Sequence, residues 1–247
     1  MQVYREHPPG PALSRYIECV WTLDSPAGID GHRVPPDGCI DIVYDRAHGL
    51  RAIGTMTTER HFHFPRGAQL TGIRFRPGMA RIFLGVSSAE LTDISLPLED
   101  LWSTRAGELQ RRLDDADAGS IGRASRILIE NLPAPAAPNL PQQAIESLAA
   151  AHGNADLDLI AHHANLSPRQ FRRRCLEETG LTPKRLARVL RFRHACRIAD
   201  GPNRPNWSDI ALEAEYFDQA HLIRDFHQFT GQTPMAVFSN TRARRSA

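Results

Sequence analysis

Three arginines stand close together in the second half of the chain, at Arg169, Arg172 and Arg173. Spacings of three and four residues from Arg169 place them on one side of a helix. A guanidinium group stays charged and can bond two acceptors at once, either phosphate oxygens or the O6 and N7 atoms of guanine. The three arginines are therefore candidates for contacts with double-stranded DNA. A charged surface that faces only solvent is the alternative interpretation.

The segment around these arginines has the pattern of a helix, a tight turn and a second helix. Apolar residues recur at i, i+3, i+4 and i+7 from Leu157 to Ala164, and Asn165 follows them. Asparagine tolerates the left-handed backbone that such a turn requires. A Ser-Pro pair at 167–168 suits the start of the next helix, and Gly180 suits its end. The pattern predicts a helix-turn-helix unit whose second helix carries the arginines.

The same pattern recurs further along the chain. A helix is expected from Trp207, with Ser208 as its cap, and a second helix from 219 to 230 before Gly231. A long helix is expected between the two units, over 183–200. Two second helices held by one fixed helix can enter successive major grooves, about 34 Å apart on one DNA face. In the second unit the residues expected to face DNA are Gln219, His221 and Arg224.

The first half of the chain mixes strand-like and helix-like segments. Strands are expected where β-branched and aromatic residues gather or alternate with polar ones, at 16–23, 39–44, 60–64 and 70–75. Helices are expected at 79–84, 105–114 and 120–131. The predicted fold class is α+β: a β-rich N-terminal domain with helices, then an all-α domain of two helix-turn-helix units joined by a long helix. The mostly antiparallel strands could enclose a pocket.

A proline-rich segment separates the two halves. Prolines at 133, 135, 138 and 141 prevent a continuous helix and favour an extended spacer. The predicted domains are a sensor or dimerisation domain at 1–132, a linker at 133–141, a DNA-binding domain at 142–240 and a basic tail at 241–247.

The charge distribution agrees with this division. Residues 142–247 contain 15 of the 30 Lys+Arg and 11 of the 28 Asp+Glu, a balance of +4, which leaves −2 for residues 1–141. A positive balance suits a surface that faces phosphates. Lys184 is the only lysine. Codon bias would also give an arginine-rich composition, so only the arginine clusters carry weight.

The two units resemble the DNA-binding domain of the AraC/XylS family of transcriptional regulators. The resemblance covers about 155–238 and rests on shared turns, caps and a terminal Gly-x-x-Pro. In the first half it lies in Ala161, Ser167-Pro168, Phe171, Glu178-Thr179-Gly180 and Thr182-Pro183. In the second half it lies in Asp209-Ile210-Ala211, Asp218-Gln219, Arg224-Asp225-Phe226 and Gly231-Gln232-Thr233-Pro234.

The resemblance implies base-reading positions at the six residues already singled out. These are Arg169, Arg172, Arg173, Gln219, His221 and Arg224. The family usually has glycine where this chain has Glu215, before the aromatic residue of the second turn. A non-glycine residue strains a left-handed turn. The first unit is therefore expected to supply most of the affinity for DNA.

The first domain resembles the N-terminal domain of one subgroup of AraC-type regulators. The similar segments are 36–44, 75–80, 91–93 and 96–101. This resemblance implies sensing or dimerisation and identifies no ligand. Trp21, Trp102 and Tyr44 are candidates to line an effector pocket, although packing in the core is the favoured interpretation.

Two other groups of residues could have carried different chemistry. His61 and His63 share one strand face, with His32 as a third candidate metal ligand, but no anchored set of four ligands accompanies them. Ordinary strand histidines are favoured, and no metal is expected. Cys39 stands near two aspartates that would raise its pKa, so a buried structural thiol is favoured over a redox sensor.

The function predicted from the sequence is a sequence-specific DNA-binding transcriptional regulator without a catalytic residue or cofactor. The expected partners are double-stranded DNA, a small-molecule effector, a second copy of the chain and RNA polymerase. With a polar start and no run of about 18 apolar residues, the expected location is the cytoplasm. The transcriptional role expected is that of an activator.

Two alternatives remain open at this point. A DNA alkyl-damage repair protein can carry a related DNA-binding domain, but it needs a nucleophilic thiolate, usually in a zinc-bound cysteine cluster. Cys19 and Cys39 alone do not supply one, and the chain has no P-loop, G-x-S-x-G or H-E-x-x-H motif. The other alternative is a protein-interaction module whose arginine surface binds acidic partners.

Overall fold

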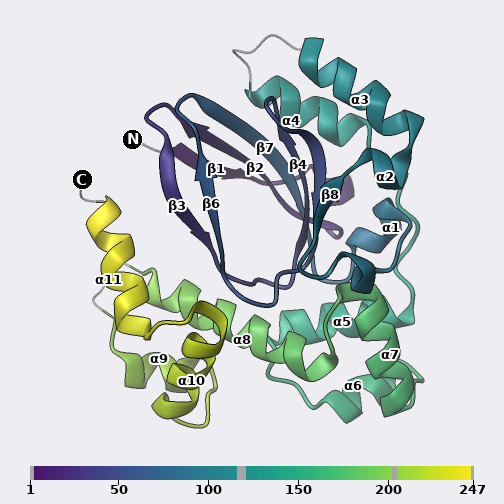
Figure 1. The fold of residues 1–247 in the computed structure, drawn as a ribbon. Helices are drawn as coiled ribbons and strands as arrows, with labels where there is room; N and C mark the ends of the chain where they lie inside the picture. The colour runs from purple at the N-terminus through teal and green to yellow at the C-terminus, as the bar shows by residue number, and fades with distance from the viewer. Residues whose placement is uncertain (1–2, 116–120, 202–204, 246–247) are drawn as a thin grey trace.

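The computed structural model describes residues 3–115, 121–201 and 205–245 and has a β-rich N-terminal part followed by a helical part (Figure 1). The strands are β1 (Val3–His7), β2 (Ile17–Ser25), β3 (Ile29–Val34), β4 (Ile40–Asp45), β5 (Gly49–Ile53), β6 (Arg60–Phe64), β7 (Ala68–Phe75) and β8 (Ser95–Pro97). The helices of this part are α1 (Ala80–Leu84), α2 (Glu99–Trp102), α3 (Thr104–Asp115) and α4 (Ile121–Glu130), with short 3₁₀ turns at Pro11–Leu13 and Ser88–Leu91.

The strands form two antiparallel sheets. Six strands pair in the order β1-β2-β7-β4-β5-β8, and β3 pairs with β6 in a separate two-stranded sheet. The period-two pattern of β4 explains its two faces: Ile42 and Tyr44 enter the main core, whereas Asp41 and Val43 face the other way. Helices α1, α3 and α4 contribute to the core on the first face, and the β3–β6 sheet stands opposite the second face (Figure 1).

The helical part contains α5 (Leu140–Ala150), α6 (Leu157–His163), α7 (Pro168–Thr179), α8 (Pro183–Ala199), α9 (Trp207–Glu213), α10 (Gln219–Thr230) and α11 (Pro234–Arg245). Helix α8 runs between the α6–α7 pair and the α9–α10 pair (Figure 1). One buried cluster joins all of them, with Phe171 of α7, Phe192 of α8 and Phe226 of α10 among its largest side chains. The predicted fold class is therefore confirmed.

The ends of the helices follow the capping rules. Ser167 and Gln170 form a reciprocal capping box at the start of α7, and Gly180 ends the helix with a left-handed backbone. The cap predicted for α9 was wrong: Asn206, not Ser208, is the N-cap, and its side chain accepts a hydrogen bond from the backbone N–H of Ser208. Asn and Ser are comparable caps, so composition alone did not decide between them.

The boundaries of some expected segments differ from the observed elements. The linker predicted at 133–141 contains the start of α5 at Leu140, where Asn139 caps the helix. The basic tail predicted at 241–247 belongs to α11 as far as Arg245, and residues 246–247 lie outside the described part of the chain. The helix predicted at 120–131 corresponds to α4. Its first predicted residue, 120, also lies outside the described part of the chain.

Strands β1, β3, β5 and β8 were not expected from the sequence. All four are short, and polar residues or glycine interrupt their apolar pattern, as in the Ile-Asp-Gly-His-Arg-Val sequence of β3. Their pairing with neighbouring strands decides their conformation. Within the described ranges, the helices are all too short or too polar to cross a membrane.

Candidate DNA interface and ligand cavity

The first helix-turn-helix unit presents the predicted arginines together. Arg169, Arg172 and Arg173 are all exposed on α7, within its first two turns. Arg173 lies 3.5 Å from the carboxylate of Glu177, a surface ion pair that DNA phosphates could replace. Asn165 has a φ of 54°, the left-handed conformation expected for the turn. The geometry presents three exposed guanidinium groups on the side of α7 that could approach a groove.

In the second unit the three candidate residues differ in their exposure and in their contacts. Arg224 of α10 is exposed and lies 4.0 Å from Asp218. Gln219 accepts a hydrogen bond of 3.0 Å from the hydroxyl of Ser208. The ring of His221 is half-buried and packs edge-on against Tyr216 at 5.1 Å. Of the three, His221 is therefore the least available to a DNA base.

Both turns have the same backbone geometry. Glu215 has a φ of 56°, close to that of Asn165 in the first unit. The N–H of Tyr216 donates to the carbonyl of Ala211 at 2.8 Å, as the N–H of Leu166 donates to that of Ala161 at 2.9 Å. Glu215 thus adopts the conformation in which a non-glycine residue is strained.

The N-terminal domain holds the C-terminal end of α7 through side-chain hydroxyl groups. Thr55 donates to the carbonyl of Thr179 at 2.7 Å, and Ser88 donates to that of Glu178 at 2.8 Å. Thr92 donates to the carbonyl of Gly180 at 3.2 Å. The last carbonyls of a helix have no partner within it, so these hydroxyl groups complete the hydrogen bonding of α7.

A buried carboxylate reinforces the same contact. The side chain of Glu178 is only 1% exposed, and it accepts hydrogen bonds from Arg81 at 2.8 Å and from Gln142 at 2.9 Å. A buried charge needs such partners, because burial removes its hydration. Arg81 belongs to the N-terminal domain and Gln142 to α5, so Glu178 links three elements.

The segment between β5 and β6, residues 54–59, contacts both helix-turn-helix units. Besides the bond from Thr55 to α7, the backbone N–H of Glu59 donates to the carbonyl of Phe229 near the end of α10 at 2.7 Å. Arg185 of α8 donates to the carbonyl of Thr57 at 3.0 Å. We call residues 54–59 the bridging loop. It contacts the C-terminal ends of α7 and α10, whereas the exposed arginines lie in the first two turns of α7.

A cavity of about 290 Å³ lies between the six-stranded sheet and the β3–β6 pair. Trp21 and Val43 line it from one sheet, and Phe62 and Phe64 from the other. Met56 of the bridging loop also lines it. The bridging loop, which contacts both helix-turn-helix units, therefore forms part of the cavity wall.

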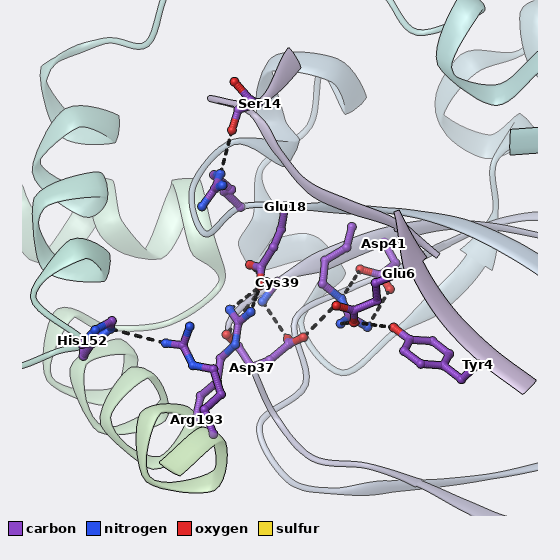
Figure 2. A network of polar contacts seen from close by, with 12 residues as sticks. Tyr4, Glu6, Ser14, Glu18, Asp37, Cys39, Asp41, His152 and Arg193 are labelled. Atoms are coloured by element: carbon purple, nitrogen blue, oxygen red, sulfur yellow. Dashed lines mark hydrogen bonds and ion pairs between the residues drawn. The ribbon is translucent and has the colours of Figure 1, made fainter. Parts of the chain in front are cut away.

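One side of the cavity carries a cluster of charged groups. The guanidinium of Arg74 lies 3.3 Å from Asp41, 3.4 Å from Asp37 and 3.5 Å from Glu6. Figure 2 shows Glu6, Asp37 and Asp41 converging at this point. Burial raises the pKa of Asp41, although the positive charge of Arg74 acts in the opposite direction.

The polar network continues to α8. The thiol of Cys39 lies 3.6 Å from Glu18 and 3.7 Å from a guanidinium nitrogen of Arg193, and Arg193 forms an ion pair with Glu18 (Figure 2). The backbone N–H of Cys39 donates to Asp37 at 2.9 Å. Since Asp37 lines the cavity, a short chain of polar contacts joins the cavity wall to the helix between the two DNA-binding units.

The structure separates the three aromatic candidates. Trp21 lines the cavity, but Tyr44 and Trp102 pack in the main core, with Tyr44 donating to Asp114 at 2.8 Å and Trp102 to the carbonyl of Phe83 at 3.1 Å. Core packing, the favoured interpretation, holds for Tyr44 and Trp102, whereas Trp21 packs in a smaller buried cluster and also lines the cavity. Phe62 and Phe64 were missed as cavity residues, although their alternation with histidines already placed them on one strand face.

The histidine group is not assembled into one site. His61 contacts Glu59 at 2.9 Å and His63 contacts Asp30 at 2.5 Å, both on the exposed surface, whereas His32 packs against Phe64. A search of the described residues finds no group of three or more side chains placed to hold a metal ion. Cys39 is buried, and burial and Asp37 together raise its pKa.

Comparison with known protein families gives two matches. Residues 5–97 match a domain of unknown function, and residues 160–240 match a helix-turn-helix domain. The second match spans both units whose turns and caps are described above. Residues 160–240 form an AraC-type helix-turn-helix domain. The match supports a DNA-binding transcription regulator.

Three solved structures to which this chain is similar are distant from it in sequence. A DNA-binding transcriptional dual regulator from Escherichia coli has 17% identity and a TM-score of 0.38, covering 45% of this chain and 99% of its own. An apo form of ToxT from Vibrio cholerae has 11% identity and a TM-score of 0.44, covering 89% and 96%. ToxT bound to an unsaturated fatty acid has 11% identity and a TM-score of 0.41, covering 88% and 92%. No curated protein matches the chain in sequence.

Proposed function

We propose that this protein regulates transcription by binding a specific DNA sequence through its AraC-type domain, under the control of a small molecule bound in the N-terminal domain. The observation that carries the DNA-binding part is the exposed set of three arginines on a capped recognition helix, α7. Arginine in the first turns of such a helix is suited to guanine edges and to flanking phosphates.

The base-reading residues proposed in the first unit are Arg169, Arg172 and Arg173. In the second unit they are Gln219, His221 and Arg224. We infer that the first unit supplies most of the affinity, because its arginines are exposed whereas His221 packs on Tyr216. The exposed ring of Phe217 precedes α10 and adds an apolar surface that thymine methyl groups can contact.

The proposal of a small-molecule effector rests on the cavity and its position. The cavity has both apolar and charged lining residues, as ligand sites usually do. Met56 of the bridging loop lines it, and the same loop contacts α7, α8 and α10. A ligand that favours one position of this loop would change how the two units are held.

DNA selection followed by affinity measurement tests the proposal. A genomic selection of bound fragments identifies the operator, and fluorescence anisotropy then compares it with random DNA at several salt concentrations. We expect tighter binding to the operator and a steep loss of affinity with salt. Equal affinity for both DNAs would remove the proposal of sequence-specific binding.

Substitution of a proposed base-reading residue gives the sharper test. Arg173→Ala should weaken operator binding by about 1–3 kcal/mol if the guanidinium reads a base. Arg224→Ala should cost less, since the second unit is expected to contribute less. Arg111→Ala removes an exposed arginine from α3, outside the AraC-type domain, and should leave affinity unchanged. An unchanged affinity for Arg173→Ala would take Arg173 out of the interface.

The family resemblance also supports finer proposals about the regulator. These are activation through contact with RNA polymerase, binding as a homodimer and a cytoplasmic location. The spacing of half-sites in the selected DNA distinguishes one bound copy from two. In vitro transcription from the selected promoter distinguishes activation from repression.

A further inference from the structure

The cavity in the N-terminal domain has an excess of negative charge. Three carboxylates, Glu6, Asp37 and Asp41, surround the single guanidinium of Arg74 at 3.3–3.5 Å. Counting three negative charges against one positive charge leaves an excess of two negative charges. Asp37 and Asp41 line the cavity itself, and their side chains are only 16% and 14% exposed. Carboxylates in such a place attract a cation more strongly than they would in open water.

Other basic side chains near the cavity already have partners. Among the lining histidines, His48 contacts Asp45 and His63 contacts Asp30. Arg193, the next guanidinium along the network, is already paired with Glu18. Arg51, also on the cavity wall, donates to the hydroxyl of Ser95 at 2.9 Å and to its carbonyl at 2.8 Å, on the β5–β8 side.

Aromatic rings line the cavity on both sides. Trp21 lies on the six-stranded sheet, where its indole N–H donates to Asp41 at 2.9 Å. Its ring occupies the space above Gly72, because a Cβ atom at that position would lie 2.4 Å from the indole. On the opposite strand, β6, the rings of Phe62 and Phe64 are nearly parallel, with centroids 6.2 Å apart. Aromatic faces carry partial negative charge and attract cations, most of all when water is excluded.

We propose that this cavity binds a compact organic cation with an aromatic or branched apolar body. The charged nitrogen faces Asp37 and Asp41, and the apolar body lies between Trp21 and the phenylalanines of β6. This inference rests on the proposed sensor function and names the class of its ligand. An anionic ligand would meet the same carboxylates and be repelled, so the cavity selects by charge as well as by shape.

The volume of the cavity limits the size of the ligand. At about 290 Å³ it stands near the lower end of the roughly 300–1,000 Å³ found for small-molecule sites. A quaternary ammonium with one aromatic ring is therefore a suitable probe. Benzyltrimethylammonium has this composition. Neopentylbenzene has the same shape with carbon in place of the charged nitrogen, and 4-phenylbutyrate carries the opposite charge on a similar body.

Calorimetric titration of the full chain, without DNA, compares the three probes directly. We expect benzyltrimethylammonium to bind at least tenfold more tightly than either neopentylbenzene or 4-phenylbutyrate. The cation should also quench or shift tryptophan fluorescence, because Trp21 lines the site. Equal affinity for the neutral probe, tighter binding of the anion, or no detectable binding of the cation would each overturn the proposal.

Three variants show where the cation binds. Asp41→Asn keeps an acceptor for the indole N–H of Trp21 but removes one negative charge, and it should weaken binding of benzyltrimethylammonium about tenfold or more. Phe62→Ala removes an aromatic wall without touching the ion cluster, so it keeps the test valid if Asp41→Asn does not fold. Glu108→Gln removes one negative charge from the exposed surface of α3 and should leave binding unchanged. Unchanged binding in a folded Asp41→Asn or Phe62→Ala protein would overturn the assignment to this cavity.

A further measurement on the same proteins distinguishes failure of this inference from failure of the proposed function. Operator affinity is measured by anisotropy with and without benzyltrimethylammonium. Cation binding with no change in operator affinity would support the ligand class and contradict the sensor role. Operator binding without any cation binding would keep the DNA-binding function and overturn the ligand class.

Discussion

The chemical reactivity of individual side chains in this protein depends more on their burial than on their neighbours along the chain. Cys39 is the clearest case, because the sequence shows a thiol near two aspartates and the structure shows it buried beside Asp37, Glu18 and Arg193. Burial is the largest cause of its raised pKa, and the charge of Asp37 is the second. A thiol that stays protonated is a poor nucleophile, so the structural interpretation of Cys39 is the one that the site supports.

The reactivity of Cys39 gives a direct measurement. In the native protein at pH 8, a thiol reagent such as iodoacetamide should leave Cys39 unmodified over minutes, with peptide mass spectrometry as the readout. The same thiol should react readily after unfolding in guanidinium, which serves as the control. Because the folded pKa lies above the ordinary value of about 8.5, this thiol also makes stability fall as pH rises above that value, where only the unfolded state ionises. Rapid native labelling would revive the redox-sensor interpretation.

The two helix-turn-helix units share one backbone design but differ in how well their turn residues suit it. Asn165 and Glu215 have nearly equal φ values of 54° and 56°. Asparagine tolerates this conformation, whereas glutamate is strained in it. The second turn is therefore held in place by the packing around it, including the buried ring of Tyr216. This agrees with the interpretation that the second unit is the weaker one.

Glycine at the second turn should relieve this strain. Glu215→Gly removes a left-handed penalty of about 1–2 kcal/mol and adds a glycine entropy cost of about 0.5–1 kcal/mol, so a net stabilisation of about 0.5–1 kcal/mol is expected. Urea unfolding of the full chain measures it. Glu108→Gly, at an exposed position in the interior of α3, should instead destabilise by about 1 kcal/mol. A destabilising Glu215→Gly would mean that the glutamate makes a favourable interaction in the turn.

At the level of the whole protein, the N-terminal domain forms hydrogen bonds with the C-terminal ends of α7 and α10 in the AraC-type domain. Hydroxyl groups from Thr55, Ser88 and Thr92 satisfy the terminal carbonyls of α7, and Glu59 bonds to the end of α10. The exposed arginines of α7 lie at the other end of that helix. The N-terminal domain thus contacts the helix-turn-helix units without covering the surface proposed to meet DNA.

Removing one hydroxyl of this contact should loosen the end of α7. Thr55→Val preserves shape but leaves the buried carbonyl of Thr179 without its 2.7 Å partner. The expected cost is about 1–3 kcal/mol, with faster hydrogen exchange at residues 177–182. Thr58→Val alters an exposed threonine of the same loop and should change neither quantity. Equal exchange in the two variants would show that the domain contact does not depend on the Thr55 bond.

The sequence by itself determined the AraC-type domain to a large extent. Its turns, caps and helix ends depend on residues a few positions apart, such as the Ser167–Gln170 capping box and the Gly180 terminator, and local rules therefore found them. The long α8 and the longer strands followed from periodicity in the same way. One cap was misplaced from Asn206 to Ser208, because two good capping residues stand two positions apart.

Only the tertiary structure decided how the N-terminal domain contacts the helix-turn-helix units and where its cavity lies. The bond between Thr55 and Thr179 joins residues 124 positions apart, and Arg81 is 97 positions from Glu178. Threonine and arginine at such positions have no pattern that distinguishes them from surface residues. The charged cavity likewise needs the sheet order β1-β2-β7-β4 before Arg74 of β7 meets its three carboxylates. Contacts of this kind depend on chain topology, which local propensity does not encode, and so the cavity and the bridging loop appear only in the folded molecule.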